Sequence, residues 1–208
     1  MRALYNSVGS AERFWQGVEL AGRFAVGDAP ALLAMRKIAR VLEEAGIPYA
    51  VAGALALGQH GYVRATVDVD LVLTKEGLAA LKALVLGRGW MERSSGSKAM
   101  RDTEHGVGID ILLTGQYPGD GKPKPIAFPD PAAVAVRVGD VCFLPLGKLV
   151  ELKLASGLSA PHRLKDLADV LELIKAATLP RELGAELDAS VRAKYDELWV
   201  AAQTRDEE

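Results

Sequence analysis

Two aspartates lie two residues apart in a stretch that otherwise has the composition of a buried β-strand. In "TVDVDLVL", Asp68 and Asp70 occupy positions i and i+2, so on a strand both side chains point to the same face. Val69 and Leu71 point to the opposite face and can pack in a core. Adjacent carboxylates repel each other unless water or a cation lies between them. The pair therefore indicates either a solvated sheet face or a metal site.

A third aspartate occurs in a second apolar stretch, "VGIDILL", where Asp110 lies between Ile109 and Ile111. A charge in such a strand is costly unless it is paired or bound to a cation. If the two strands are neighbours, three carboxylates form an oxygen-rich site suited to Mg²⁺. Sites of this kind serve phosphoryl or nucleotidyl transfer with two metal ions.

A phosphate group would also need hydrogen-bond donors. Gly53 follows the apolar stretch "YAV" and begins the short helical stretch "ALALGQH". Backbone N–H groups at the start of a helix can bind an anion, although a glycine there can also simply make a tight turn. Gly53 and Ala54 are the candidate phosphate-binding positions.

The elements that position these residues follow from hydrophobic periodicity and from Gly and Pro punctuation. We expect strands near 49–53, 66–73, 90–95, 98–102, 107–115 and 140–146, and helices over 31–45, 54–61, 76–87, 146–158, 161–177 and 181–204. The Gly- and Pro-rich residues 115–131 predict a long loop. This is an α+β layout: a small mixed β-sheet with flanking helices and a C-terminal helical segment.

We expect four regions along the chain: an N-terminal helical extension over 1–30, an α/β core over 31–145, a helical segment over 146–204 and a disordered tail over 205–208. The 25 basic and 27 acidic residues give a formal net charge of -2, so no overall basic charge favours nucleic acid. The single cysteine excludes an internal disulfide. Neither a secretory signal nor a membrane-spanning run is recognisable, so we expect a cytoplasmic protein without membrane contact.

These motifs together resemble the nucleotidyltransferase superfamily, which has the DNA polymerase β-like fold. Its pattern is a strand, a Gly-Gly or Gly-Ser at a helix start, a D-x-D strand and a third Asp on a later strand, matched here by Gly53-Ala54, Asp68-Val69-Asp70 and Asp110. The chain is most similar to bacterial AbiEii-like, abortive-infection toxin proteins. Their "R-x-T-x-D-x-D" matches residues 64–70, and their C-terminal helical motif matches "LKLASGLSAPHRLKDLADV".

The resemblance implies an enzyme that transfers a nucleoside monophosphate from an NTP to a hydroxyl group. It implies that Asp68 and Asp70 bind two Mg²⁺ ions and that Asp110 is a third ligand or the base for the hydroxyl. The nucleotide-binding residues would be Gly53, Ala54, Arg64, Thr66, Lys153, Lys165 and Asp166. The acceptor could be an RNA 3′ end such as that of tRNA, a protein or a small molecule, and the partner of such a toxin would be an antitoxin protein.

The sequence is also compatible with several alternatives. Arg64 can bind a phosphate or pair with an acidic neighbour. Thr66 can simply hold the loop before Asp68. Asp166 and Asp169 can occupy the exposed face of an amphipathic helix. Because Ala54 offers no hydroxyl, the chain could be a catalytically degenerate nucleotide-binding or protein-interaction module with the same fold. A metal-dependent phosphodiesterase could use the same carboxylates.

Overall fold

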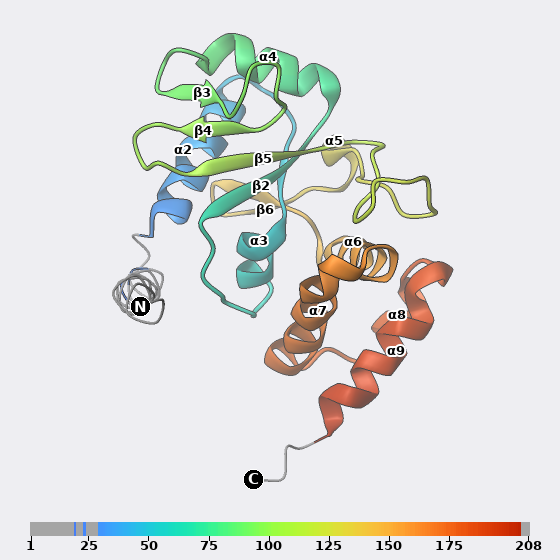
Figure 1. Cartoon of the computed structure of the whole chain (residues 1–208). Coiled ribbons are helices and arrows are strands. Elements are labelled where there is room, and N and C mark those ends of the chain that lie inside the picture. Colours follow the sequence, from blue (N-terminus) through green and yellow to red (C-terminus); the bar gives the residue numbers. More distant parts are fainter. Residues whose placement is uncertain (1–18, 20–22, 24–28, 205–208) are drawn as a thin grey trace, which may run out of the picture.

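The computed structural model describes Glu19, Arg23 and residues 29–204 (Figure 1). Most of the expected N-terminal extension and the expected tail over 205–208 lie outside the described residues. The described chain has an α+β architecture, in which one mixed sheet carries helices on both faces and is followed by a group of C-terminal helices. The predicted fold class is confirmed.

The sheet has seven strands in the order β3-β4-β5-β2-β1-β7-β6. The pairs β2–β5 and β1–β7 are parallel, and the other neighbours are antiparallel. The strand bounds are β1 Ala50–Val51, β2 Asp68–Leu73, β3 Trp90–Glu92, β4 Met100–Asp102, β5 Gly108–Leu113, β6 Val136–Val138 and β7 Val141–Phe143. The long central strands β2 and β5 alternate between the hydrophobic core and an open face, and this alternation positions the aspartates.

Two helices, α2 (Pro30–Glu44) and α4 (Lys75–Val85), cover one face of the sheet, and α3 (Gly53–Gln59) with α6 (Leu146–Ser159) lies over the other (Figure 1). The α2 helix begins at a proline, which suits the first helical turn, and its apolar residues at helical spacing are buried. Thr74 caps α4, because its hydroxyl oxygen accepts a hydrogen bond from the Gly77 N–H at 2.9 Å. The main core lies between α2, α4 and the sheet, so polar side chains can occupy the part of the opposite face that α3 and α6 leave open to the cavity.

The C-terminal helices are α6, the 3₁₀ turn η1 (Pro161–Arg163), α7 (Leu164–Ala177), α8 (Leu183–Glu186) and α9 (Ala189–Gln203). The expectation of one final helix over 181–204 is wrong. The chain breaks at Leu187 and Asp188, where the Asp188 side chain accepts a hydrogen bond from the Ser190 N–H and caps α9. The Asp188 N–H donates to Glu151 of α6 at 2.8 Å, so the break also anchors α9 to the rest of the protein.

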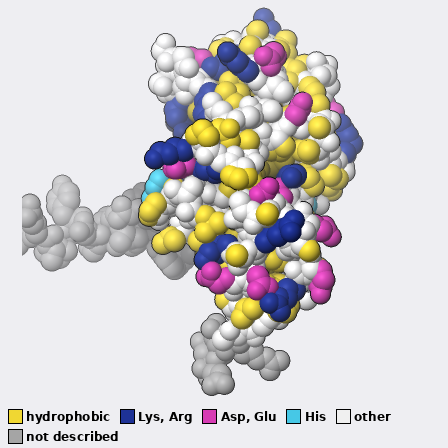
Figure 2. Space-filling model, turned by 90° about the vertical axis from the view of Figure 1, so that its right-hand side faces the viewer, with side chains coloured by type: hydrophobic (Ala, Val, Ile, Leu, Met, Phe, Trp, Pro, Cys, Tyr) yellow, Lys and Arg dark blue, Asp and Glu magenta, His cyan; other side chains and the backbone are white. Residues whose placement is uncertain are grey.

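A hairpin of β6 and β7 forms one edge of the sheet, and a short helix, α5 (Pro131–Val134), leads into it. The sequence predicted only the second strand, because β6 is a three-residue strand whose side chains are all exposed. Residues 115–130 contain no helix or strand, as predicted. In the described part of the chain, no helix is both long and apolar enough to cross a membrane. Charged side chains of both signs are dispersed over the face shown in Figure 2.

Candidate active site

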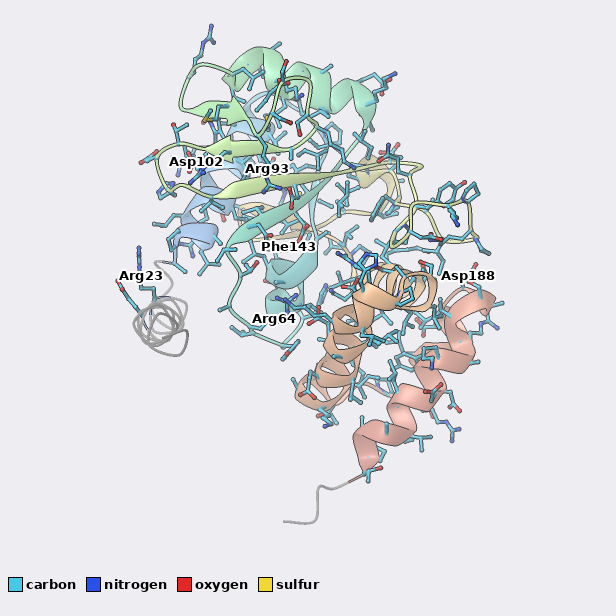
Figure 3. All side chains as sticks on the ribbon, in the orientation of Figure 1. Arg23, Arg64, Arg93, Asp102, Phe143 and Asp188 are labelled. Atoms are coloured by element: carbon cyan, nitrogen blue, oxygen red, sulfur yellow. The ribbon has the colours of Figure 1, made fainter. Side chains whose placement is uncertain are left out.

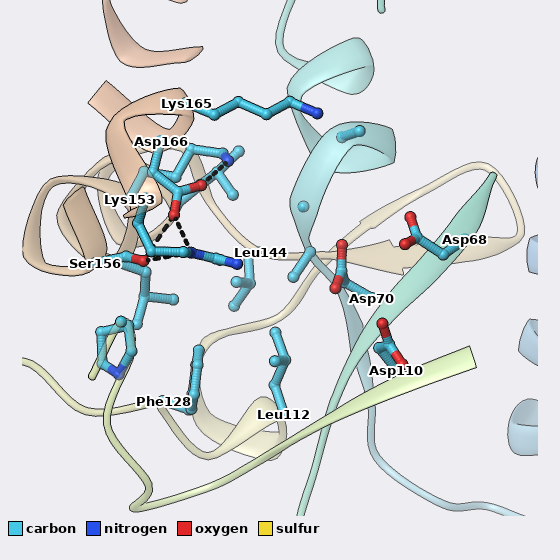
Figure 4. A pocket seen from close by; sticks show the side chains of 18 of the residues that line it. Asp68, Asp70, Asp110, Leu112, Phe128, Leu144, Lys153, Ser156, Lys165 and Asp166 are labelled. Atoms are coloured by element: carbon cyan, nitrogen blue, oxygen red, sulfur yellow. Dashed lines mark hydrogen bonds and ion pairs between the residues drawn. The ribbon is translucent and has the colours of Figure 1, made fainter. Parts of the chain in front are cut away.

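The three predicted aspartates lie on one face of the sheet. Strands β2 and β5 are parallel neighbours in a register that pairs Asp70 with Asp110 and Asp68 with Gly108. The intervening residues of both strands point to the core and are at most 1% exposed: Val69, Leu71, Ile109 and Ile111. Asp68, Asp70 and Asp110, called the aspartate triad below, therefore line the open face together (Figure 4). The prediction that the two strands carrying the aspartates are neighbours in the sheet is confirmed.

Asp70 is the central carboxylate of the triad, and its electrostatic environment is unfavourable for a negative charge. Burial, together with the negative charges of the nearby Asp68 and Asp110, raises the pKa of Asp70 to about 6. Lys153 and Arg163 act in the opposite direction. Removal from water disfavours the charged form of a carboxyl group, and neighbouring negative charges do the same. A divalent cation would relieve this repulsion.

The two outer carboxylates each have a partner. The Thr66 hydroxyl donates to Oδ1 of Asp68 at 2.6 Å, and Nη1 of Arg93 lies 3.2 Å from Oδ1 of Asp110. In the described part of the chain, the Asp70 side chain makes no such hydrogen bond. The triad thus consists of two oriented carboxylates on either side of one that a cation could engage.

Gly53 begins α3 directly against Asp70. Its backbone has φ +59°, in the left-handed region, and a Cβ atom built there would overlap Oδ2 and Cγ of Asp70. Only glycine adopts this conformation readily and also leaves room for the carboxylate. Ala54, the next residue, is 5% exposed. The glycine is therefore required by close packing on the triad, which is a more specific reason than a tight turn.

A cavity of about 1060 Å³ opens in front of the triad. It is large enough for a nucleotide, since small-molecule sites typically measure roughly 300–1,000 Å³. Every candidate site residue predicted from the sequence lines this central cavity: Gly53, Ala54, Arg64, Thr66, Asp68, Asp70, Asp110, Lys153, Lys165 and Asp166. Figure 4 shows the triad on one wall, Lys153 and Asp166 on the facing wall, and Leu112, Phe128 and Leu144 between them.

A network of ion pairs forms the facing wall. The Lys153 ammonium lies 2.7 Å from Asp169 and 3.0 Å from Asp166. Arg64 binds Asp169 through two bonds, Nε to Oδ1 at 2.8 Å and Nη2 to Oδ2 at 3.0 Å, so it ties the loop before β2 to α7 (Figure 3). The interpretation that Arg64 pairs with an acidic neighbour is confirmed, and the same side chain also lines the cavity.

Asp166 and Asp169 are buried, with 8% and 2% of their surface exposed, so the alternative that they lie on an exposed helix face is wrong. Asp166 also accepts hydrogen bonds from Ser156 Oγ at 2.6 Å and from Arg163 Nε at 2.9 Å. Despite burial, which acts the other way, its pKa is lowered by Lys153, Ser156 and Arg163. We call Arg64, Lys153, Ser156, Arg163, Asp166 and Asp169 the charged network.

Residues 115–128 form another wall of the cavity. The ends of this loop are joined by hydrogen bonds from the Gly115 N–H to Phe128 O at 2.9 Å and from the Phe128 N–H to Gln116 O at 2.8 Å. In its middle, Lys124 donates to Pro118 O at 2.5 Å and to Ser159 Oγ of α6 at 3.0 Å. The loop is thus fastened both to itself and to α6.

Sequence reasoning missed two arginines at the site. Arg163 lines the cavity next to Asp166, and its position two residues before Lys165 in "HRLKD" is a signal that could have found it. Arg93 contacts Asp110 from the end of β3. No local pattern marks Arg93, because its contact with the triad depends on how β3 and β4 pair with β5.

A second acidic cluster lies on the core side of the sheet. Within the described residues, Asp102, Glu104 and His105 are the set whose potential metal-binding atoms all lie within 4.8 Å of one another. Lys37 already occupies this cluster, with its ammonium 2.6 Å from Asp102 and 2.8 Å from Glu104. The negative charge of this second cluster is therefore balanced by Lys37, whereas Asp70 of the triad has no such direct partner in the described chain.

A scan against protein-family models finds no match to this sequence, and a search of curated proteins also finds none. Among solved structures, the chain is similar to ANT(2″)-Ia, in a crystal structure of its complex with adenylyl-2″-tobramycin. The TM-score is 0.48 and the sequence identity 18%, over 84% of this chain and 96% of that chain. The similarity is one of backbone arrangement.

Proposed function

We propose that this protein is a Mg²⁺-dependent nucleotidyltransferase that moves a nucleoside monophosphate from an NTP to a hydroxyl group and releases pyrophosphate. The observation that carries the proposal is the in-register pairing of β2 with β5, which lines up the aspartate triad on the wall of the central cavity. Carboxylates that face cationic side chains across a cavity of nucleotide size are suited to binding a polyphosphate together with Mg²⁺.

The donor set of the triad fits Mg²⁺, which prefers carboxylate, water and phosphate oxygens. Asp68 and Asp70 would hold two ions, and Asp110 would complete the set. Bound Mg²⁺ would neutralise charge on the phosphates and polarise the phosphorus for attack. Thr66 keeps Asp68 oriented for this role, since its hydroxyl holds one carboxylate oxygen at 2.6 Å.

In the transfer, a bond forms between the acceptor oxygen and the α-phosphorus, and the bond from the α-phosphorus to the pyrophosphate oxygen breaks. The hydroxyl proton must go to a base, and we assign this role to Asp110, whose side chain is 35% exposed. Gly53 and Ala54 bring backbone N–H groups to the same wall, where they would bind phosphate oxygens.

The cations of the facing wall differ in how much charge they can offer a phosphate. Lys153 shares its charge with Asp166 and Asp169, so its main role here is to hold the charged network together. Among the described residues, Arg163 donates hydrogen bonds only through Nε, to Ser156 and Asp166, and half of its side chain is exposed. We assign phosphate binding to the outer nitrogens of Arg163 and to Lys165, both of which line the cavity. Arginine is well suited because its guanidinium binds phosphate through two hydrogen bonds.

The test is incubation of the full chain with each α-phosphate-labelled NTP and Mg²⁺, in the presence of total RNA, cell protein or aminoglycosides as separate acceptor pools. We expect label in one pool and an equal amount of pyrophosphate. Both should be lost in Asp70→Asn and on chelation of the metal. Asp140→Asn, which changes an exposed aspartate in the β6–β7 turn, should retain full activity.

Other outcomes would identify the alternatives. NTP binding with unchanged affinity in Asp68→Ala and without pyrophosphate release would show a degenerate nucleotide-binding module, for which the absence of a hydroxyl at Ala54 is the specific indication. Cleavage of phosphodiesters without any NTP would show a phosphodiesterase. In both cases the transferase proposal fails.

From the sequence resemblance alone, we further propose that the protein is the toxin of a toxin–antitoxin pair. Induced expression of the wild-type chain should then arrest bacterial growth, and Asp70→Asn at equal protein level should not. Normal growth with both chains would contradict a toxin role without touching the enzymatic proposal.

A further inference from the structure

The Arg93 guanidinium reaches the acidic face of the sheet from the far side of β4 (Figure 3). Its Nη1 lies 3.2 Å from Oδ1 of Asp110. A Cβ atom built on Gly108 would lie 2.6 Å from Nη2 of Arg93 and 4.0 Å from Cβ of Asp68. Gly108 is the register partner of Asp68, so the guanidinium of Arg93 lies directly beside the triad. It fits there because Gly108 has no side chain.

The backbone from which Arg93 extends is fixed. The Arg93 N–H donates to Ala99 O at 3.1 Å. The preceding residue, Glu92, accepts hydrogen bonds from Lys82 at 2.6 Å and from the Gly96 N–H at 2.8 Å. The base of the side chain is therefore held at the end of β3, although 56% of the side chain is exposed.

We propose that Arg93 is a positioning residue for the nucleotidyl transfer described above, on which this inference rests. It holds Oδ1 of Asp110 and so orients this carboxylate toward the acceptor hydroxyl, as Thr66 orients Asp68 on the other side. Without this contact the Asp110 side chain, which is 35% exposed, could adopt other staggered rotamers. Misplacement of a reacting group by about 1 Å can slow a reaction by roughly 100-fold.

If Arg93 had a purely structural role, its loss would lower Tm and leave turnover of the folded protein unchanged. We expect instead that folding is nearly unchanged, because an ion pair with an exposed arginine contributes little to stability. A positioning role instead changes turnover and the attraction of the triad for a cation, because a positive charge beside Asp110 competes with Mg²⁺. The two roles are therefore separable by kinetics, metal binding and thermal unfolding measured on the same variants.

The experiment compares the full chain with four variants: Arg93→Ala, Arg93→Lys, Gly108→Ala and Arg101→Ala. Gly108→Ala leaves every charged group in place but puts a methyl group where the guanidinium lies, so it should displace the flexible end of Arg93. Arg101→Ala is the matched control, because Arg101 is also an exposed arginine and lies on β4, the strand next to β5. Its guanidinium lies near Gly106 and not against the triad: a Cβ atom built on Gly106 would be 3.5 Å from Nη2 of Arg101. The readouts are kcat and KM for the NTP, Mg²⁺ affinity by calorimetry, and Tm.

We expect kcat to fall about 10- to 100-fold in Arg93→Ala and Gly108→Ala while KM for the NTP stays within about twofold. Arg93→Lys should recover part of kcat. Mg²⁺ should bind Arg93→Ala about two- to fivefold more tightly than wild type, as expected for removal of one partly exposed competing charge. Arg101→Ala should behave as wild type.

Unchanged kcat and Mg²⁺ affinity in both Arg93→Ala and Gly108→Ala would overturn the inference, as would an equal loss in Arg101→Ala. If the wild-type chain transfers no nucleotide to any acceptor, the proposed function fails. The calorimetry then still decides whether Arg93 acts on the triad, because Mg²⁺ binding needs no turnover.

Discussion

Asp70 has opposite effects on function and on stability. Its folded-state pKa of about 6 lies above the 3.8 of an unperturbed aspartate side chain. At pH values between these two, the folded protein binds more protons than the unfolded chain, so stability decreases as the pH rises through this window. Above pH 6 the charged Asp70 destabilises the metal-free protein, and this is the cost of keeping a carboxylate ready for a cation.

We therefore predict that Asp70→Asn stabilises the metal-free protein by about 2 kcal/mol at pH 7.5 while abolishing nucleotide transfer. The gain should shrink as the pH falls from about 6 toward 4, because Asp70 then becomes neutral in the wild type as well. Urea unfolding of both chains at a series of pH values measures the difference. A gain that is the same at pH 4 and at pH 7.5 would exclude the charge of Asp70 as its cause.

Gly53→Ala should abolish activity and lower the free energy of unfolding by about 2–3 kcal/mol, from left-handed strain and from overlap of the new methyl group with Asp70. Gly46→Ala is the control for strain alone, since Gly46 has φ +64° and nothing within 4 Å of an added Cβ. It should cost about 1 kcal/mol and leave activity intact. Equal kinetics in the two variants would show that the overlap with Asp70 is unimportant.

For single residues of the candidate site, the sequence predicted the position of the acidic side chains well and that of their cationic neighbours poorly. Asp68 and Asp70 follow from the two-residue repeat of a strand, and Asp110 from its apolar flanks. Arg93 reaches the triad only through the pairing of β3, β4 and β5, which no local pattern encodes. Asp169 has the spacing of an exposed position, but the docking of α7 against α6 buries it beside Lys153.

The charged network joins the loop before β2 to α6 and α7. Asp169→Ala should destabilise the protein by about 3–4 kcal/mol, because it leaves Lys153 and Arg64 without their shared partner in a buried position. In a double-mutant cycle, Arg64→Ala and Asp169→Ala should show a coupling energy above about 1 kcal/mol. Chemical unfolding of the four chains measures both quantities.

The chain offers a matched control for this cycle. Arg181 binds Asp196 through the same two-bond geometry, Nε to Oδ1 at 2.5 Å and Nη2 to Oδ2 at 3.0 Å, but about half of each side chain is exposed. Exposed pairs of this kind are worth about 0–1 kcal/mol. A coupling energy for Arg64 with Asp169 no greater than that of the exposed pair would mean that burial adds nothing to the network.

Among the elements, helices with a strong apolar stripe and the two long strands were predictable, while short ones were not. The α2, α4 and α7 helices carry enough apolar repeats to be recognised. Strand β6 has three exposed residues and exists because β7 pairs with it. The break between α8 and α9 depends on Asp188, which caps α9. Its N–H donates to Glu151 of α6, and this tertiary contact cannot be recognised from the local sequence.

For the whole molecule, a ligand that binds only the folded state raises its stability. At an Mg²⁺·NTP concentration 100 times the dissociation constant, the gain is about 2.7 kcal/mol, which in a chain of this size corresponds to a rise in Tm of roughly 5–10 °C. We predict this rise for the wild type with Mg²⁺ and NTP together, and little rise in Asp70→Asn. Differential scanning fluorimetry measures it, and equal rises in both chains would place the nucleotide away from the triad.

The register of β2 against β5 also has a consequence for how the chain finds its fold. These strands are neighbours in space but are separated by α4, β3 and β4 along the chain, so their pairing is a long-range contact, of the kind that slows folding. A slip by one residue would reverse the faces of the slipped strand. Carboxylates would enter the core, and residues such as Val69 and Leu71 would face water. The aspartates thus disfavour a one-residue slip, since that misalignment buries a charge that the native register keeps at the surface of the cavity.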